Sequence, residues 1–416
     1  MKKTIKTVAT TLLFILTTTF VILIILNLKN KNILPQHQEE QTLTLFNWGE
    51  YLEPSIIEKF EKETHIKIKQ VLFSSNELAV TKIKSKNQYD LAILSEYAID
   101  QLRQSKMLET IDDGELIKDD KHYYELNKDL QNKLPSEFNN YAVPYFWGKV
   151  VILYNKNKIT QDQIKEIKDQ NKGFKYLKDT NLKVALCNNA RDGLMVGLKA
   201  TEGKIANPSP DELNEAKKWL LELKEQKPNL AFINDQLMDR MKNKNNEYYD
   251  IVIAYSGDAN FLKEQNNNLD CFSPTEGTNV WVDALVMPKG SKKTLAYKFI
   301  NFLRQKENYK NNLAFTKYNS PYVGLETFPG IPQIEIKGND EVYKYDQTTQ
   351  KTINTYWNDI IAFPSQKDYW LFILSFFIFL AIFIIYFHHK FKNKLRLDQL
   401  PQKNKNFNII CSNPKY

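Results

Sequence analysis

Aromatic rings and carboxylates gather at four places in this 416-residue chain, and at each place they end or interrupt an apolar run. A carboxylate neutralises an organic ammonium ion, while ring faces attract the cation and cover its methylene groups. Four such groups, far apart in sequence, predict one site for an organic cation assembled from distant segments. The four are Phe46-Asn47-Trp48-Gly49-Glu50-Tyr51, Ser95-Glu96-Tyr97, Tyr255-Ser256-Gly257-Asp258 and Trp281-Val282-Asp283.

Strand and helix patterns alternate around the first two groups. Apolar or alternating runs predict strands, and a proline or a capping box predicts each helix start. This βαβαβ order predicts a parallel sheet with helices on its faces. The predicted strands are residues 43–46, 66–68 and 89–94, and the predicted helices begin at Pro54 and after Ser74-x-x-Glu77.

The second half of the chain continues the alternation. Ser209-Pro210-x-Glu212 is a capping box, and the apolar residues from Leu213 to Leu223 recur at helical spacing, so they are predicted to be core. The Asn- and Lys-rich stretches 155–175 and 242–247 predict loops or weak helices. Further strands are predicted at 249–254 and 280–287, and a helix at 294–303.

Three of the four groups follow predicted strands directly. Ligands bind beyond the carboxyl ends of the strands in open parallel sheets, so these groups are expected to meet at one edge. Asp283 lies inside an apolar strand instead, where a lone carboxylate is expensive to bury and needs a cation or a hydrogen-bond network. The residues that follow strands are Trp48, Tyr51, Ser95, Tyr97, Tyr255 and Asp258.

Composition argues against several classes of protein. The net charge is +8, but only five of the 57 basic residues are Arg and the Lys are scattered, so no nucleic-acid partner is expected. The sequence contains no HExxH motif and no Cys/His set, so no metal or cofactor is expected. It also contains no nucleophile elbow, so a hydrolase is not expected and the chain is not expected to be an enzyme. For Cys187 and Cys271, a bridge is open but two free thiols are favoured.

Two uncharged apolar runs bracket the remainder. Residues 8–28 exceed a signal-peptide core and lack a small-x-small cleavage site, so they predict a transmembrane signal anchor within a start segment 1–32, with cleavage as the alternative. Residues 369–387 predict a second transmembrane helix, with a buried core helix as the alternative, before a basic tail at 388–416. The positive-inside rule then places both termini in the cytoplasm and the intervening residues outside the cell membrane.

Four stretches together carry a resemblance to a known family. They are Leu45-Phe46-Asn47-Trp48-Gly49-Glu50-Tyr51, Tyr89-Asp90-Leu91-Ala92-Ile93-Leu94-Ser95, Val143-Pro144-Tyr145-Phe146-Trp147-Gly148 and Trp281-Val282-Asp283-Ala284-Leu285. With them, residues 42–360 resemble the substrate-binding proteins of polyamine ABC importers, the spermidine/putrescine type.

The resemblance implies a fold and a function. The fold is α/β, two-lobed, hinged and periplasmic-binding-protein-like (type II), here flanked by the N-terminal and C-terminal transmembrane helices. Lobe 1 is expected to comprise residues 42–146 plus 283–325, and lobe 2 residues 147–282 plus 326–362. The function is an extracytoplasmic receptor that closes on putrescine or spermidine and delivers it to ABC permease subunits driven by a cytoplasmic ATPase.

The family's ligand contacts carry over position by position. Asp258 matches an acidic residue of putrescine-preferring members, and Tyr255 takes the place of a Trp. Asn189 stands where family members have an acidic residue, and Glu96 replaces a smaller polar residue. The implied contacts are Trp48, Tyr51, Ser95, Tyr97, Asp192, Tyr255, Asp258, Trp281, Asp283 and Tyr318, with Glu50, Glu96, Asn189 and Asn358 as weaker candidates.

Other interpretations stay open at this point. From pattern alone, Trp48, Tyr51 and Tyr97 are core aromatics as readily as ligand contacts, and Asp258 is as readily a turn or helix-cap residue. Arg191 is an internal alternative partner for Asp283. The same fold also serves other cationic amines or amino acids. A ligand-sensing membrane receptor is a further alternative, although a tail of about 29 residues is short for a signalling domain.

Overall fold

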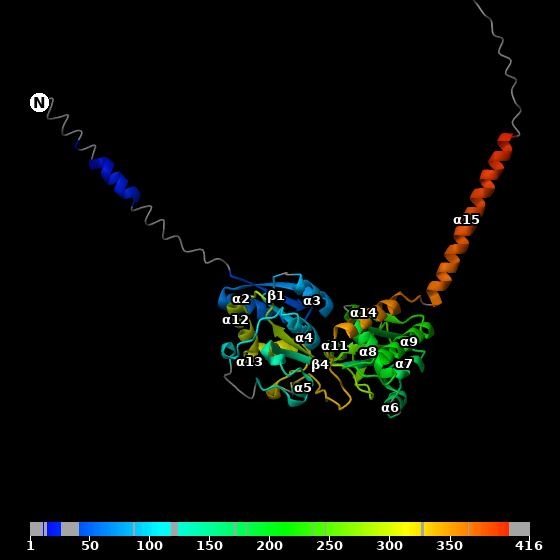
Figure 1. The fold of residues 1–416 in the computed structure, drawn as a ribbon, viewed down its shortest axis with the longest axis horizontal. Helices are drawn as coiled ribbons and strands as arrows, with labels where there is room; N and C mark the ends of the chain where they lie inside the picture. The colour runs from blue at the N-terminus through cyan, green and yellow to red at the C-terminus, as the bar shows by residue number, and fades with distance from the viewer. Residues whose placement is uncertain are drawn as a thin grey trace, which may run out of the picture.

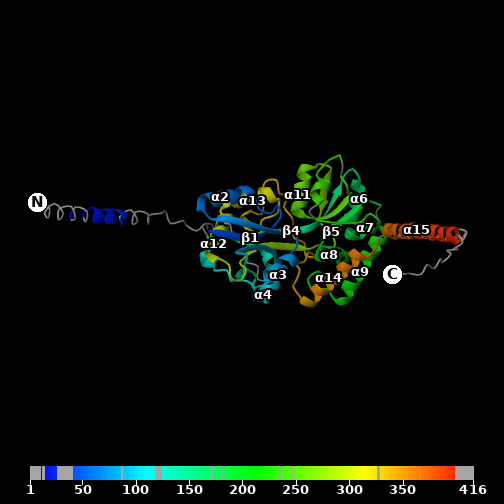
Figure 2. The same cartoon turned by 90° about the horizontal axis from the view of Figure 1, so that it is seen from above.

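Two lobes, each built on one half of a curled mixed sheet, make up the domain in the computed structural model (Figures 1 and 2). The strand order among the described strands is β2-β1-β3-β9-β4-β7-β5-β6, and β8 pairs with β4. The structure describes residues 11, 15–25, 41–85, 88–117, 124–169, 172–179, 181–234, 236–245, 247–325, 328–364 and 366–398.

Lobe 1 holds the amino-terminal half of the sheet. Strands β1 and β2, and β1 and β3, pair in parallel, as the βαβαβ pattern predicts. The strands are β1 Thr42–Trp48, β2 Lys67–Phe73, β3 Leu91–Ser95 and β9 Val280–Val286. The helices are α2 Pro54–Thr64, α3 Asn76–Lys84, α4 Glu96–Gln104, α5 Lys128–Lys133, α12 Lys293–Arg304 and α13 Lys306–Thr316, with 3-10 turns at Asp113–Glu115, Phe138–Asn140 and Val323–Leu325.

Lobe 2 contains the other half of the sheet. Strand β5 pairs in parallel with both β6 and β7. The strands are β5 Val184–Cys187, β6 Ala231–Ile233, β7 Ile251–Tyr255 and β8 Leu269–Phe272. The helices are α6 Gln161–Asp169, α7 Tyr176–Asp179, α8 Ala190–Ala200, α9 Pro210–Gln226, α10 Gln236–Met241, α11 Ser256–Gln265 and α14 Gln347–Ala362, with a 3-10 turn at Gly173–Lys175.

Strand β4, Ala142–Asn155, belongs to both lobes. Its first half pairs with β9, and its second half pairs with β7 and β8, all antiparallel. The prediction of a parallel sheet is therefore wrong for the middle of the sheet. The reason is topological, since β9 returns to lobe 1 between β3 and β4 and runs against both.

Two faces of each half-sheet are buried. In lobe 1, Leu43 and Leu45 of β1 face α2 and α12, while Phe46 faces α3 and α4. In lobe 2, Ile251 and Ile253 of β7 face α8, α9 and α14, while Val252 and Ala254 face α10 and α11. Successive side chains along each strand point to opposite faces of the sheet, so each half-sheet has a layer of core on both faces. These two layers fix the positions of the strand ends that carry the site.

Local signals explain several helix starts. Ser209 and Glu212 form the predicted reciprocal capping box of α9, and Pro54 occupies the start of α2. The capping prediction for α3 is wrong by one residue, because the Ser75 hydroxyl rather than that of Ser74 accepts the Leu78 N–H. The stretch 155–175, predicted as loop or weak helix, contains the regular helix α6.

Two apolar helices flank the domain. Helix α15, Gln366–Asp398, leaves lobe 2 next to α14 (Figure 1). Within it, Leu371–Lys392 is long and apolar enough to cross a membrane, with a mean hydropathy of 2.6. Near the other end, Ile15–Ile25 forms a shorter apolar helix. The remainder of the predicted span 8–28, apart from residue 11, and most of the tail lie outside the described residues.

Candidate functional site

Asp283 lies where β3 ends against β9. The antiparallel register sets Ser95 opposite Asp283, and the Ser95 hydroxyl donates a 2.6 Å hydrogen bond to Oδ1 of Asp283. The Asp283 side chain is buried. Burial raises the pKa of its carboxyl group to about 6, although the hydrogen bond from Ser95 opposes that rise. Asp283 therefore lies in a buried polar network, and Arg191 is not its direct partner.

Four aromatic rings from both lobes pack together, and two of them, Tyr51 and Tyr318, lie near this carboxylate. The centroid of Trp281 lies 5.1 Å from that of Tyr318 and 6.1 Å from that of Tyr255, and the centroid of Tyr51 lies 5.4 Å from that of Tyr318. All three pairs are close to perpendicular, a favourable arrangement for ring quadrupoles. We call these four residues the ring cluster.

Glycines allow the ring cluster to pack closely. A Cβ at Gly148 of β4 would come within 2.6 Å of the Trp281 ring, and one at Gly257 within 2.4 Å of the Tyr318 ring. The indole N–H of Trp281 is buried and has no hydrogen-bond partner among the described residues. The buried Tyr51 hydroxyl lies beside Asp283 and acts as a hydrogen-bond donor to its carboxyl group. A buried donor is expensive to leave unpaired, so this packing of the ring cluster carries a cost at the Trp281 indole.

Asp258 joins the ring cluster from lobe 2. It lies in the first turn of α11, where a negative charge is favourable, and its Oδ1 accepts a 2.9 Å hydrogen bond from the Tyr318 hydroxyl. Tyr318 follows α13 of lobe 1, so this bond links the two lobes. Asp258 therefore acts as a first-turn residue and as a member of the site, two roles that the sequence alone could not separate.

Asp192 is the third carboxylate of the site. It lies in the first turn of α8, and its oxygens accept hydrogen bonds from the Tyr255 hydroxyl at 2.6 Å and from the amides of Asn189 at 2.9 Å and Asn279 at 3.2 Å. Burial nevertheless raises its pKa. Asn189 also caps α8 through the Asp192 N–H. Asn189 thus donates a hydrogen bond to the Asp192 carboxylate and accepts one from the Asp192 backbone N–H.

Tyr97 is covered by a cation from the protein. The guanidinium carbon of Arg191 lies 3.6 Å from the centroid of the Tyr97 ring and 4.9 Å from that of Tyr343. Glu77 of α3 lies 3.8 Å from the Arg191 Nε and accepts a hydrogen bond from the Tyr97 hydroxyl. Because Arg191 comes from α8 and Tyr97 from α4, this stack spans the two lobes.

Glu96 is fully buried on the first turn of α4. Its Oε2 accepts the Val282 N–H at 3.0 Å, whereas its Oε1 has no hydrogen-bond partner among the described residues. Burial raises the pKa of Glu96 to about 8, and the nearby negative charge of Asp283 adds to the rise.

The remaining predicted site residues do not belong to the ring cluster. Trp48 is half-buried and packs on Phe73 with 4.5 Å between ring centroids. Glu50 is exposed and has a left-handed backbone with φ 52°. Asn358 is exposed on α14, whose buried residues include Trp357, and among the described contacts none joins Asn358 to the ring cluster.

Sequence reasoning missed two participants, Asn279 and Tyr343, and assigned Arg191 a different partner. Asn279 binds Asp192, Tyr343 packs on Arg191, and Arg191 itself covers Tyr97. Asn279 directly precedes the predicted strand at 280–287, and this position next to Trp281 and Asp283 could have marked it as a site residue. Nothing in the sequence around Tyr343 distinguishes it from a core tyrosine.

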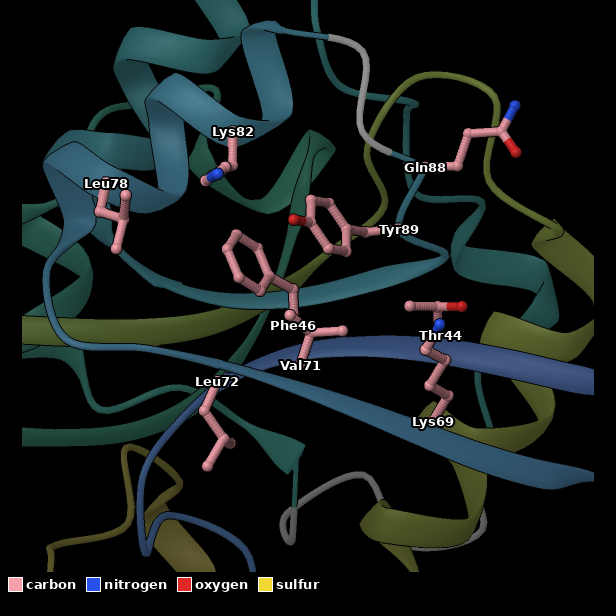
Figure 3. A pocket seen from close by; sticks show the side chains of 9 residues that line it. All are labelled: Thr44, Phe46, Lys69, Val71, Leu72, Leu78, Lys82, Gln88 and Tyr89. Atoms are coloured by element: carbon pink, nitrogen blue, oxygen red, sulfur yellow. The ribbon is translucent and has the colours of Figure 1, made fainter.

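Two cavities in the described residues lie away from the ring cluster. One, of about 360 Å³, opens at the β1–β2 edge of lobe 1 beside Phe46, Tyr89, Lys69 and Lys82 (Figure 3). The other, of about 460 Å³, is lined by Trp147, Asn319 and residues 333–336. The chemistry described above belongs to neither. Among the described residues, no group of three or more His, Cys, Asp or Glu side chains is arranged for a metal ion. Cys187 and Cys271 are free thiols.

A two-lobed α/β fold with charged and aromatic groups between the lobes is the architecture of a solute-binding protein. Residues 55–323 match the family of bacterial extracellular solute-binding proteins, and the chain belongs to this family. The family binds solutes for ABC transporters and is not a family of enzymes.

Relatives within the family are named for polyamines. The spermidine/putrescine-binding periplasmic protein of Salmonella typhimurium is 28% identical over 320 residues, covering 75% of this chain and 86% of the relative. The putrescine-binding periplasmic protein PotF of Escherichia coli is 28% identical over 285 residues, covering 64% and 74%. The crystal structure of the spermidine/putrescine ABC transporter substrate-binding protein PotD from Streptococcus pneumoniae has a TM-score of 0.61 and 28% identity, covering 78% of this chain and 99% of that one.

Proposed function

We propose that this chain is the membrane-anchored, extracytoplasmic receptor of an ABC importer for polyamines, putrescine or spermidine or both. The observation that carries the proposal is that Asp192, Asp258 and Asp283, from three distant segments, each lie against the same ring cluster. Desolvating an ammonium group is expensive unless it meets a negative charge. A polyamine presents two or more such groups joined by methylenes, which suit several carboxylates around aromatic walls.

The division of labour follows from these positions. Asp283 pairs with one ammonium group, and Asp192 or Asp258 pairs with another. Trp281, Tyr255 and Tyr318 flank the methylenes, and the buried hydroxyl of Tyr51 lies beside Asp283. Because these rings contact one another, ligand entry requires the lobes to separate and then close again. We assign residues 42–146 plus 283–325 to lobe 1 and 147–282 plus 326–362 to lobe 2. The hinge then comprises two crossovers, one within β4 and one near the start of β9.

Calorimetric titration of the full chain in detergent tests the function. The ligands are putrescine, spermidine, arginine and ferric iron, at one pH and one salt concentration. Saturable binding of a diamine or triamine below the millimolar range, at least tenfold tighter than arginine, is the expected result. If neither polyamine binds below the millimolar range, the polyamine assignment fails.

A receptor for another cationic amine or amino acid is the second candidate. Asn189 favours it, because this neutral amide stands where polyamine receptors carry an acid, and a ligand with fewer positive charges needs fewer carboxylates. Arginine binding tighter than either polyamine in the same titration would select this candidate.

Both termini are proposed to lie in the cytoplasm, with α15 and the segment 8–28 crossing the membrane. Two anchors hold the receptor near the permease and raise its effective concentration there. Protease added to intact cells, with the outer barrier permeabilised where one is present, tests the arrangement. The binding domain should be cleaved while an epitope tag after Tyr416 survives, and loss of that tag from outside contradicts the topology.

A further inference from the structure

Two consecutive residues at the start of α4 contact two consecutive residues of β9. The Ser95 hydroxyl donates to the Asp283 carboxylate at 2.6 Å, and the Val282 N–H donates to the Glu96 carboxylate at 3.0 Å. Ser95 and Asp283 also face one another in the strand register. These paired contacts hold the Glu96 and Asp283 carboxyl groups close together in a buried site.

Glu96 has one oxygen with no partner. Its side chain is fully buried, and Oε1 accepts no hydrogen bond from any described residue. A buried carboxylate in that state would be strongly destabilising, whereas a carboxylic acid carries no charge to desolvate. The geometry therefore favours the protonated form of Glu96.

The groups that face Glu96 do not supply a paired cation. Asp283 of β9 contributes a negative charge, and Tyr343, which precedes α14, is a neutral phenol at ordinary pH. Arg191 of α8 attenuates the effect, but its guanidinium stacks on Tyr97 and lies 3.8 Å from Glu77 of α3. The pKa of Glu96 is accordingly raised to about 8, first by burial.

We propose that Glu96 carries a proton in the ligand-free chain and releases it when an ammonium group binds beside Asp283. This inference rests on the proposed polyamine function. The O–H bond of the carboxylic acid breaks, its electron pair stays on the carboxylate, and the proton passes to solvent. The bound ammonium group takes over the neutralising role, so Glu96 makes binding depend on proton concentration.

The coupling has a definite sign. At pH 7 the ligand-free site must lose a proton before Glu96 attracts the cation, and at higher pH that proton is already absent. Polyamine affinity should therefore rise by about tenfold from pH 6.5 to 7.5, where Asp283 is largely ionised already. By reciprocity, the bound cation lowers the pKa of Glu96.

Calorimetry in several buffers tests the proposal. Putrescine and spermidine are titrated into the full chain at pH 7 in buffers of different ionisation enthalpy, and the slope of the observed enthalpy gives the protons released. Wild type should release close to one proton per bound ligand. Glu96→Gln, which keeps an acceptor for the Val282 N–H, should release almost none and lose most of the pH dependence. Glu58→Gln, at an exposed position of α2, is the matched control and should behave as wild type.

The outcomes separate this inference from the function on which it rests. Polyamine binding without proton release, or equal release by wild type and Glu96→Gln, overturns the role of Glu96 and leaves the receptor function intact. Absence of polyamine binding to wild type overturns the function itself, and the role of Glu96 with it.

Discussion

Replacing Asp283 by Asn should weaken polyamine binding sharply. Asp283 is buried, and the groups described around its carboxylate are the neutral hydroxyl donors of Ser95 and Tyr51 rather than a cation. An ammonium group is therefore the charge partner that its position calls for. A hydrogen bond between charged partners contributes about 1.5–3 kcal/mol. Losing that charge should therefore weaken binding by about 10–150-fold.

The same substitution should leave the ligand-free chain at least as stable as wild type. The pKa of Asp283 is raised from 3.8 to about 6 by burial, so the folded chain holds that proton more tightly than the unfolded chain. The stabilisation from the protonated form is complete below pH about 4 and is lost as pH rises through about 6. Above pH 7 the ionised group therefore destabilises the fold by roughly 3 kcal/mol, a cost that Asn does not carry.

The assay measures both quantities on the same preparations. Affinity comes from calorimetry with spermidine at pH 7.5, and stability from the thermal midpoint without ligand, which should rise by several degrees, on the order of 5 °C. Asp162→Asn, at an exposed position of α6, is the control and should change neither. The reasoning is refuted if Asp283→Asn lowers the midpoint while affinity stays within threefold of wild type, because Asp283 would then be a structural residue.

Three further outcomes follow from other contacts. Asp258→Ser should weaken putrescine binding more than spermidine binding, as calorimetry with both ligands would show, and equal losses count against the putrescine-type role. Lys149→Met should destabilise the chain by about 3–5 kcal/mol in denaturant unfolding, because it leaves Asp340, its fully buried partner at 2.6 Å, uncompensated. The exposed control Lys156→Met should stay within about 0.5 kcal/mol of wild type. The Glu96→Gln chain should keep nearly constant putrescine affinity from pH 6.5 to 7.5, and a wild-type slope there would contradict its role.

Local signals predicted much of the fold. A short apolar run identified β1, alternation of Ile with Lys identified β2, Pro54 marked the start of α2, and Ser209 with Glu212 fixed the start of α9. The direction of β9 was not predictable in this way, because an apolar run predicts a buried strand without indicating whether it pairs in parallel or antiparallel. Its antiparallel course depends on where the chain returns between the lobes, which is a tertiary property.

Part of the site was also accessible from the sequence. A carboxylate beside an aromatic residue at a strand end identified Asp258, and a lone carboxylate inside an apolar strand identified Asp283; the structure brings both to one ring cluster. Contacts between residues of different lobes could not be predicted from the sequence, because Arg191 contacts Tyr97 only after the two lobes have folded and come together. For the same reason the complete burial of Glu96 was invisible, because its immediate neighbours in sequence do not enclose it.

Determining the structure of the chain with spermidine bound would show whether the three carboxylates bind the ligand. We expect an ammonium nitrogen within hydrogen-bond distance of Asp283, another near Asp192 or Asp258, and methylenes against Trp281. Spermidine bound in the cavity beside Phe46 or the cavity beside Trp147, with all three carboxylates turned away from it, would rule out the proposed site.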